Sequence, residues 1–243
     1  MAVSRVWLFA VIALFMAILP AATATTAVVM PVLPQPRTYE SIEFLEGVAE
    51  HAVAEDGNYT IATNAFWLDK PSLAISVSSK DGASDEAVQS VKGMVSGNTT
   101  MSGQYSQWND LLSAFKQKSV PRLALAAGDG ADANIKVVLT DVAQQDNKPG
   151  KTRLLADKAT GEIVQAEVYV YSADKLFKQG VLEYVVAHEL GHALGLSHST
   201  DPQSMMYPLI ELQDGHVVNR LGLCEMEGIS ALYLESRIGS ESC

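Results

Sequence analysis

The chain has 243 residues, of which 48% are hydrophobic, and its formal net charge is −11. This length and hydrophobic content suffice for one sizeable core, so we expect one domain after processing. The acidic balance, without a basic stripe interleaved with aromatic residues, argues against a protein that binds nucleic acid.

Residues 1–24 have the pattern of a secretory signal peptide. Arg5 gives a positive start, Val6–Leu19 is a run of 14 apolar residues, and Ala22–Ala24 suits a cleavage site. A helix needs about 20 apolar residues to cross a bilayer. We therefore expect a secreted, extracellular protein without stable membrane association; an anchor formed by an uncleaved N-terminal segment is the alternative.

Residues 25–60 are expected to form a linker or a short pro-segment. Pro31, Pro34 and Pro36 favour an extended chain at its start. Apolar residues at helical spacing then predict a short amphipathic helix, and they are Ile42, Leu45, Val48, Ala49 and Val53. A brief pro-segment lying across a cleft, a packed N-terminal helix and a flexible leader all fit this pattern.

The main domain is expected over residues 61–243, with strands before and after a helix. Apolar residues alternate with small polar ones from Leu73 to Val77 and predict a first strand. An amphipathic helix is predicted over residues 105–115. Further strands are predicted over residues 123–127, 133–140, 152–156 and 163–171. Asp157–Gly161 fits a hairpin turn between the last two strands.

The stretch that begins at His188 reads H-E-x-x-H-x-x-G-x-x-H. His188 and His192 are four residues apart on a predicted helix, so both imidazoles can reach one ion. Gly195 can adopt a left-handed conformation at the helix end, which turns the chain so that His198 completes the ligand set. The pattern predicts one catalytic zinc ion bound by three histidines.

Glu189 follows the first predicted ligand and points about 100° around the helix from it. Its carboxylate is therefore expected beside the water that zinc activates, where it would act as general base and then as general acid. This chemistry indicates a zinc-dependent endopeptidase. One alternative is a catalytically inactive or latent secreted zinc-binding or adhesion protein. Another is a zinc peptidase whose third ligand is a distant glutamate, Glu225 or Glu227.

The motif and its surroundings resemble the matrixins, the matrix metalloproteinase family (peptidase family M10) of the metzincin clan. Ser199 follows the third histidine, residues 198–208 (HSTDPQSMMYP) resemble the link to the family's Met-turn, and Glu227–Tyr233 resembles the start of its C-terminal helix. The resemblance implies an α+β, zincin-like catalytic domain. Such a domain has a twisted mixed five-stranded sheet, two long helices, a Met-turn and a C-terminal helix.

The resemblance also implies roles for residues around the zinc. Met206 is expected to be the methionine that forms an apolar floor beneath the imidazoles. The edge strand of this fold pairs with an extended substrate, and residues 153–156 are our assignment for it. The expected substrate-pocket residues are Tyr207, Pro208, Leu154 and Leu155.

The chain departs from the vertebrate family members in its histidines and cysteines. No histidine lies between His51 and His188, so we expect no second, structural zinc. No cysteine precedes Cys224, so the inhibitory cysteine of the family's propeptide is missing and the chain resembles a minimal matrixin. Cys224 and Cys243 flank the predicted C-terminal helix and are expected to pair in an oxidising compartment.

Acidic residues near strand ends are candidates for a structural calcium ion, which related enzymes use, although a solvated loop is the simpler explanation. They are Asp129, Asp132, Asp141 and Asp146. We expect a monomer that acts on proteins or peptides, with extracellular matrix proteins among the candidate substrates, and no nucleic-acid partner.

Overall fold

The computed structural model describes residues 37–45, 63–98, 104–127, 130–144, 148–210, 212–213 and 216–234. The chain divides into two compact units, Met1–Pro36 and Arg37–Cys243, and the described residues all belong to the second. The predicted signal peptide lies outside them. Within the described part of the chain, no helix is long and apolar enough to cross a membrane.

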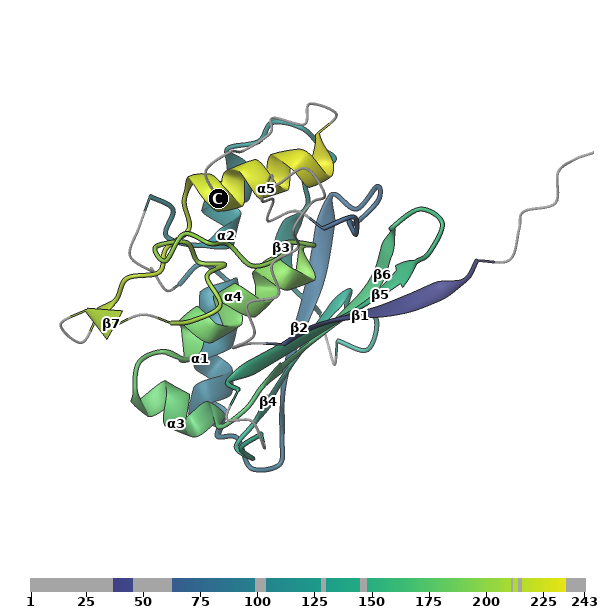
Figure 1. The fold of residues 1–243 in the computed structure, drawn as a ribbon. Coiled ribbons are helices and arrows are strands. Elements are labelled where there is room, and N and C mark those ends of the chain that lie inside the picture. The colour runs from purple at the N-terminus through teal and green to yellow at the C-terminus, as the bar shows by residue number, and fades with distance from the viewer. Residues whose placement is uncertain are drawn as a thin grey trace, which may run out of the picture. The chain divides into compact units, whose positions relative to one another are not determined.

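A mixed six-stranded sheet forms one layer of the second unit, in the order β1-β5-β6-β4-β2-β3. The strands are β1 (Tyr39–Leu45), β2 (Ser72–Lys80), β3 (Arg122–Leu125), β4 (Ile135–Thr140), β5 (Gly150–Asp157) and β6 (Ile163–Val170). β2 is parallel to β3 and β4, and β4 is parallel to β6. β5 is antiparallel to both β1 and β6. In Figure 1 the sheet is twisted and β1, in purple, runs along its edge.

Helices form the second layer, on one face of the sheet. They are α1 (Asp85–Val95), α2 (Trp108–Ser113), α3 (Ala173–Lys178), α4 (Leu182–Ala193) and α5 (Leu223–Tyr233). α1 packs on β2 and β3, and α4 packs on β5 and β6 (Figure 1). A two-stranded hairpin, β7 (Leu212–Gln213) and β8 (His216–Val217), lies between α4 and α5 in the sequence. The α+β fold with a mixed sheet is therefore confirmed.

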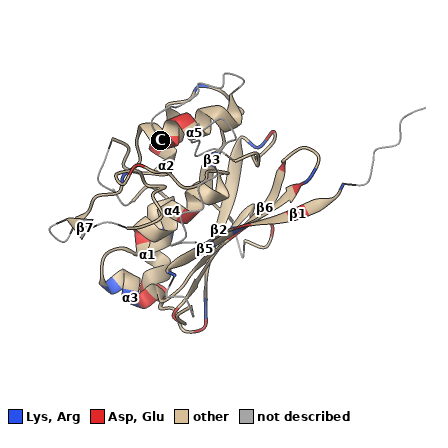
Figure 2. Ribbon diagram, viewed as in Figure 1, with Lys and Arg blue, Asp and Glu red and all other residues tan. Residues whose placement is uncertain are grey.

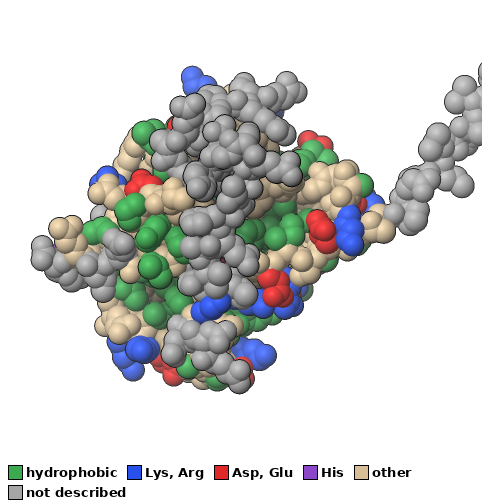
Figure 3. All heavy atoms as spheres, in the orientation of Figure 1, with side chains coloured by type: hydrophobic (Ala, Val, Ile, Leu, Met, Phe, Trp, Pro, Cys, Tyr) green, Lys and Arg blue, Asp and Glu red, His purple; other side chains and the backbone are tan. Residues whose placement is uncertain are grey.

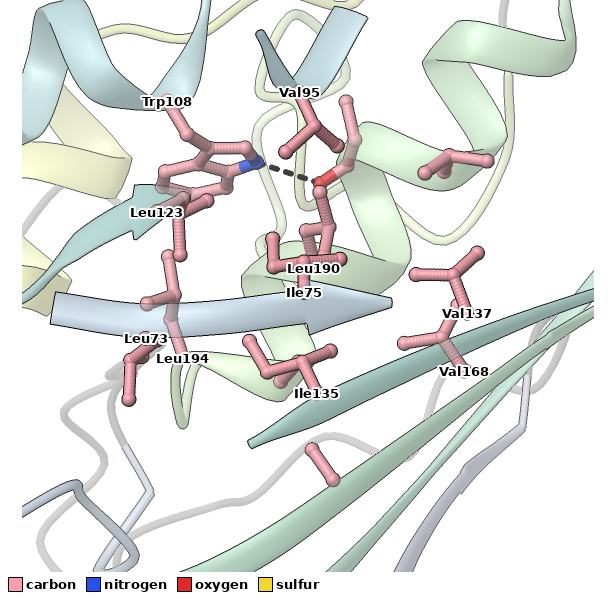
Figure 4. Close-up of a cluster of buried hydrophobic side chains, with 14 of the residues drawn as sticks. Leu73, Ile75, Val95, Trp108, Leu123, Ile135, Val137, Val168, Leu190 and Leu194 are labelled. Atoms are coloured by element: carbon pink, nitrogen blue, oxygen red, sulfur yellow. Dashed lines mark hydrogen bonds between the residues drawn. The ribbon is translucent and has the colours of Figure 1, made fainter. Parts of the chain in front are cut away.

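The core lies between these two layers, because alternate strand residues point toward the helices. In Figure 4, Ile75, Ile135 and Val168 from three strands belong to the same buried cluster as Leu190 of α4. All four side chains are at most 1% exposed. Full burial of such a side chain stabilises the fold by about 1.5–3 kcal/mol. This packing fixes α4, the helix that carries the H-E-x-x-H motif, against the sheet.

The sequence did not predict α1, although its signals are present. Ser84 caps the helix, since its hydroxyl accepts a hydrogen bond from the backbone N–H of Ala87 at 3.3 Å. Apolar residues at helical spacing are buried along one face, and they are Ala87, Val88, Val91, Met94 and Val95. The predicted helix over residues 105–115 is shorter in the structure, where α2 covers Trp108–Ser113.

The predicted helix around residues 42–53 is wrong for its described part, because residues 39–45 form strand β1. Ile42 and Phe44 pack half-buried against the core, while Ser41 and Glu43 are exposed, which is the two-residue period of a strand. The edge of β5 offers unpaired backbone groups. Pairing with that edge overrides the helical spacing, and the sheet gains a sixth strand beyond the five predicted.

Candidate metal centre

Three histidine side chains converge at the end of α4. His188 and His192 come from the helix and His198 from the loop after it, and one ring nitrogen of each lies within 4.8 Å of the others. The Nε2 atoms of His188 and His192 are 3.1 Å apart, and those of His192 and His198 are 3.2 Å apart. Two ligands bound at about 2.0–2.1 Å to one tetrahedral zinc ion lie roughly 3.4 Å apart. The spacing therefore fits a single ion.

The other ring nitrogens determine which tautomer two of these histidines adopt. Nδ1 of His188 lies 2.6 Å from the carbonyl oxygen of Met205, and Nδ1 of His192 lies 2.8 Å from that of Leu196. A carbonyl oxygen only accepts, so Nδ1 carries the proton in both rings. Each Nε2 then keeps a lone pair that points toward its neighbours. This set of donors suits a cation, and three imidazoles suit zinc.

The chain reaches His198 through a left-handed residue. Gly195 has φ +98°, as the sequence predicts, and a Cβ at this position would lie 2.2 Å from the carbonyl oxygen of Ala65. The position therefore requires glycine on both counts. The backbone N–H of Leu196 bonds back to the carbonyl of Gly191 at 3.0 Å, so the chain folds under the helix end.

Side chains from distant segments satisfy the last carbonyl groups of α4 and the turn after it. Trp67 Nε1 donates to Ala193 O at 2.8 Å, and the Tyr233 hydroxyl donates to Leu194 O at 2.8 Å. Burial raises the pKa of the Tyr233 phenol, so this hydroxyl stays protonated and donates. A helix end leaves four carbonyl groups without helical partners. These bonds therefore fix the end of the helix that carries two of the histidines.

Glu189 lies on the side of α4 that faces β5 and is fully buried. The hydroxyl of Thr152 is hydrogen-bonded to Glu189 Oε2 and lies 3.1 Å from its backbone oxygen. A Cβ at Gly150 would come within 2.0 Å of Glu189 Oε1. The sequence interpretation missed Gly150 and Thr152. The only sequence signal for their contact with Glu189 is that they are two small residues at alternate positions of a strand.

Met206 is fully buried in the turn formed by residues 204–207. Its sulfur packs on α4 where the motif has Gly191, because a Cβ there would lie 2.2 Å from Sδ. The backbone N–H of Ser199, next to His198, donates to Met206 O at 2.8 Å. The Met-turn is therefore bonded directly to the loop that carries the third histidine.

Glu225 was also missed as a supporting residue, and it braces this turn from α5. Its buried carboxylate accepts hydrogen bonds from the hydroxyl of Ser204, from the backbone N–H of Met206 at 3.3 Å and from that of Gly222 at 2.7 Å. Glu225 is also one of the two glutamates that the sequence allows as an alternative third metal ligand. Within the described residues, the group of potential ligands that could hold an ion contains only the three histidines.

The predicted pocket residues occupy different places. Tyr207 and Pro208 follow Met206 and are half-buried. Leu154 is fully buried in the core, whereas Leu155 is 38% exposed. Adjacent strand residues point to opposite faces, so these two leucines lie on opposite sides of β5. Their contact with a substrate remains a prediction.

The predicted cysteine pair and calcium residues are only partly described. Cys224 is buried in the first turn of α5 and is disulfide-bonded, while Cys243 lies outside the described residues, so their pairing stays a prediction. Asp132 and Asp141 are exposed, and Asp129 and Asp146 lie outside the described residues. The calcium site therefore also stays a prediction.

Comparison with known proteins gives a family. The matrixin family model matches residues 89–234, which is more than half of the chain. A stretch of 49 residues is 49% identical to stromelysin-1 of Equus caballus, and covers 20% of this chain and 10% of that protein. A stretch of 49 residues is 49% identical to matrix metalloproteinase-20 of Homo sapiens, with the same coverage.

Interstitial collagenase of Sus scrofa is 48% identical over 59 residues, which cover 24% of this chain and 12% of that protein. These matches span about a tenth of the length of the curated relatives, so the activities and substrates of those proteins remain proposals for this chain. The family itself suggests a zinc metalloprotease. By its family match, its fold and its three converging histidines, the chain belongs to the matrixin family.

Proposed function

We propose that this chain is a secreted zinc-dependent endopeptidase that hydrolyses internal peptide bonds of proteins. The observation that carries the proposal is the convergence of His188, His192 and His198 beside the carboxylate-bearing residue Glu189. The three histidines would hold zinc, and Glu189 would move the proton. This arrangement serves hydrolysis, whereas a protein that only binds zinc has no use for the carboxylate.

When bound, zinc would polarise the substrate carbonyl group and lower the pKa of water to about 7. Met205 O and Leu196 O fix the rings of two histidines, so their ligand atoms need little reorganisation. The carboxylate of Glu189 would take a proton from the attacking water and then give it to the leaving amine. Thr152 donates a hydrogen bond to this carboxylate and holds it in place.

The substrate would bind as an extended strand along β5. The expectation that residues 153–156 form the edge of the sheet is not met, because β1 pairs with β5 on the outside. A substrate would reach β5 in place of β1, and β5 begins at Gly150, next to Glu189. Main-chain hydrogen bonds to this edge would hold a peptide with its backbone close to the site. Tyr207 and Pro208, directly after the Met-turn, would line the pocket for the side chain that follows the cleaved bond.

The test is cleavage of a quenched-fluorescent peptide library by the full chain, with Glu189→Ala protein run alongside. A third sample is stripped of metal by a chelator and then given zinc again. We expect cleavage that needs both Glu189 and zinc. Zinc binding without cleavage of any peptide would favour the alternative of a latent or non-catalytic zinc-binding protein. Cleavage by the Glu189→Ala protein would contradict the assigned role of the glutamate.

A further inference from the structure

The edge of β5 on which a substrate would bind is paired with the chain's own strand β1. The pairing is antiparallel and continuous, from Tyr39 opposite Asp157 to Leu45 opposite Lys151. The register ends one residue before Gly150, whose Cα backs onto Glu189. A strand that continued in this register would place its next residue opposite Gly150, beside the carboxylate. β1 therefore runs toward the metal centre.

One face of β1 packs toward α4 and the histidines. Ile42 and Phe44 point to this side and are half-buried against the core. The ring of Phe44 stacks on the ring of His192, with centroids 4.4 Å apart and planes 10° from parallel. The strand thus reaches the metal centre itself through an aromatic side chain.

The other face of β1 carries one carboxylate between two basic side chains of β5. Glu43 lies 2.8 Å from Lys151 Nζ and 2.8 Å from Arg153 Nη2, and Arg153 Nε donates to it at 2.9 Å. Hydrogen bonds from Lys151 and Arg153 hold the pKa of Glu43 below its usual value. On the far side of β5, Tyr169 lies opposite Lys151 and Glu167 lies opposite Arg153.

This concentration of charge is local. Over the rest of the described chain, acidic and basic residues are spread over many elements (Figure 2). In Figure 3, acidic and basic side chains lie next to one another on the sheet side of the face shown, beside hydrophobic side chains. Both basic side chains keep some exposure, 17% for Lys151 and 44% for Arg153, although β1 is in place. A different strand on this edge would meet the same two cations.

We propose that Lys151 and Arg153 form a subsite that selects an acidic side chain in the substrate, and that β1 occupies this subsite as a substrate-like strand. The proposal rests on the proposed function and deepens it by naming a substrate class. Arg153 is three residues beyond Gly150 on β5. The acidic residue is therefore expected about three residues before the residue beside Glu189, on the amino-terminal side of the cleaved bond.

Binding can be tested without turnover, in full-chain protein that carries Glu189→Gln so that peptides stay intact. The probe is a fluorescent peptide of residues 37–45, compared with the same peptide carrying lysine in place of Glu43. Because the chain's own strand competes at high effective concentration, the assay protein also carries Glu43→Lys. Glu40→Lys, the same charge change at another exposed position of β1, is its matched control.

By anisotropy, we expect the Glu43→Lys protein to bind the acidic peptide about tenfold more tightly than the lysine peptide, because two charge-assisted contacts are at stake. It should also bind the acidic peptide more tightly than the Glu40→Lys protein does. Adding Lys151→Glu and Arg153→Glu should reverse the order of the two peptides. The pair Lys70→Glu and Lys118→Glu, an equal charge change at exposed sites off this edge, should leave the order unchanged. Equal binding of the two peptides, or a reversal by the control pair, would overturn the proposal.

Cleavage kinetics then separate this proposal from the proposed function. Two quenched substrates that differ only by glutamate or lysine at the selected position should differ about tenfold in kcat/KM in Glu43→Lys protein with Glu189 intact. Cleavage of both at equal kcat/KM would reject the acidic subsite and leave the endopeptidase standing. Charge-selective binding without any cleavage would reject the endopeptidase and leave the subsite standing.

Discussion

The indole N–H of Trp67 donates to the carbonyl oxygen of Ala193, 2.8 Å away, and both residues are at most 1% exposed. Ala193 is the last residue of α4, so the helical repeat gives its carbonyl no backbone donor. A second indole, that of Trp108, donates at 2.7 Å to Ala187 O in the middle of the same helix (Figure 4). The two tryptophans therefore donate to α4 at two different places. The first of the two accepting carbonyl groups has no helical donor, and the second lies in the middle of the helix.

We expect Trp67→Phe to destabilise the protein more than Trp108→Phe. The first change leaves a buried carbonyl without a donor, which costs about 1–3 kcal/mol. The second leaves Ala187 O with its own bond from the N–H four residues on, so the loss should be nearer 1 kcal/mol. Urea unfolding of the full chain, compared at equal m-values, measures the difference. A larger loss for Trp108→Phe would mean that ring packing, and not the helix-end bond, dominates.

Gly150→Ala should reduce turnover without loss of zinc. The new methyl group would lie 2.0 Å from Glu189 Oε1, so the carboxylate must move away from its place beside β5. Loss of a positioned general base lowers the rate by about 10²–10⁴-fold. Gly222→Ala is the matched control, since a Cβ there meets only Glu225 Oε2 at 3.9 Å. Zinc content and kcat are measured for both; an unchanged kcat in Gly150→Ala protein would show that the carboxylate tolerates the shift.

Much of the fold could be predicted from the sequence because the strands bury alternate residues. The alternation around Leu73, Ile75 and Val77 predicted β2, and Asp157–Gly161 formed the predicted turn between β5 and β6. The sequence did not predict β1. Its local spacing fits a helix, and it becomes a strand only because β5, more than 100 residues later, offers an open edge.

The site was predicted where its geometry is local in sequence. Four-residue spacing on one helix and a glycine at its end suffice to bring His188, His192 and His198 together. The supporting residues come from other segments. Thr152 and Glu225 reach the site only through the packing of β5 and α5 against α4 and the Met-turn, and no spacing in the sequence records that packing.

Asp174→Asn should lower stability at neutral pH and have little effect in acid. The carboxylate of Asp174 accepts hydrogen bonds from Ser84 N at 2.9 Å and Ser84 Oγ at 2.8 Å, which link α3 to the cap of α1. The hydrogen bond from the backbone N–H of Ser84 lowers the pKa of Asp174 most, and the bond from the Ser84 hydroxyl lowers it further. The Asp174 carboxylate therefore stabilises the fold fully above its unfolded pKa of about 3.9. This stabilisation is lost as the pH falls through its lower pKa in the folded state.

For Asp174→Asn, the loss in unfolding free energy should be below about 1 kcal/mol at pH 7, because the group is partly exposed and screened. The difference from the parent protein should shrink toward zero below about pH 3. Urea titrations across pH 3–7 measure it, with Glu86→Gln at the exposed start of α1 as the control for one lost charge. A difference that persists in acid would mean that the neutral hydrogen bonds, and not the charge, stabilise this contact.

His198→Ala and Glu225→Gln should separate a ligand from its support. His198 contributes one of three converging nitrogens, so its loss should weaken zinc binding by more than the roughly 10–100-fold that removal of a supporting partner costs. Glu225→Gln instead replaces a carboxylate that accepts bonds from Ser204, Met206 and Gly222 by an amide with one acceptor oxygen. It should cost about 1–3 kcal/mol of stability while zinc stays bound. Competition with a chelator gives the zinc affinities, and urea unfolding gives the stabilities. Retention of zinc in His198→Ala protein with loss in Glu225→Gln protein would transfer the third ligand from the histidine to the glutamate.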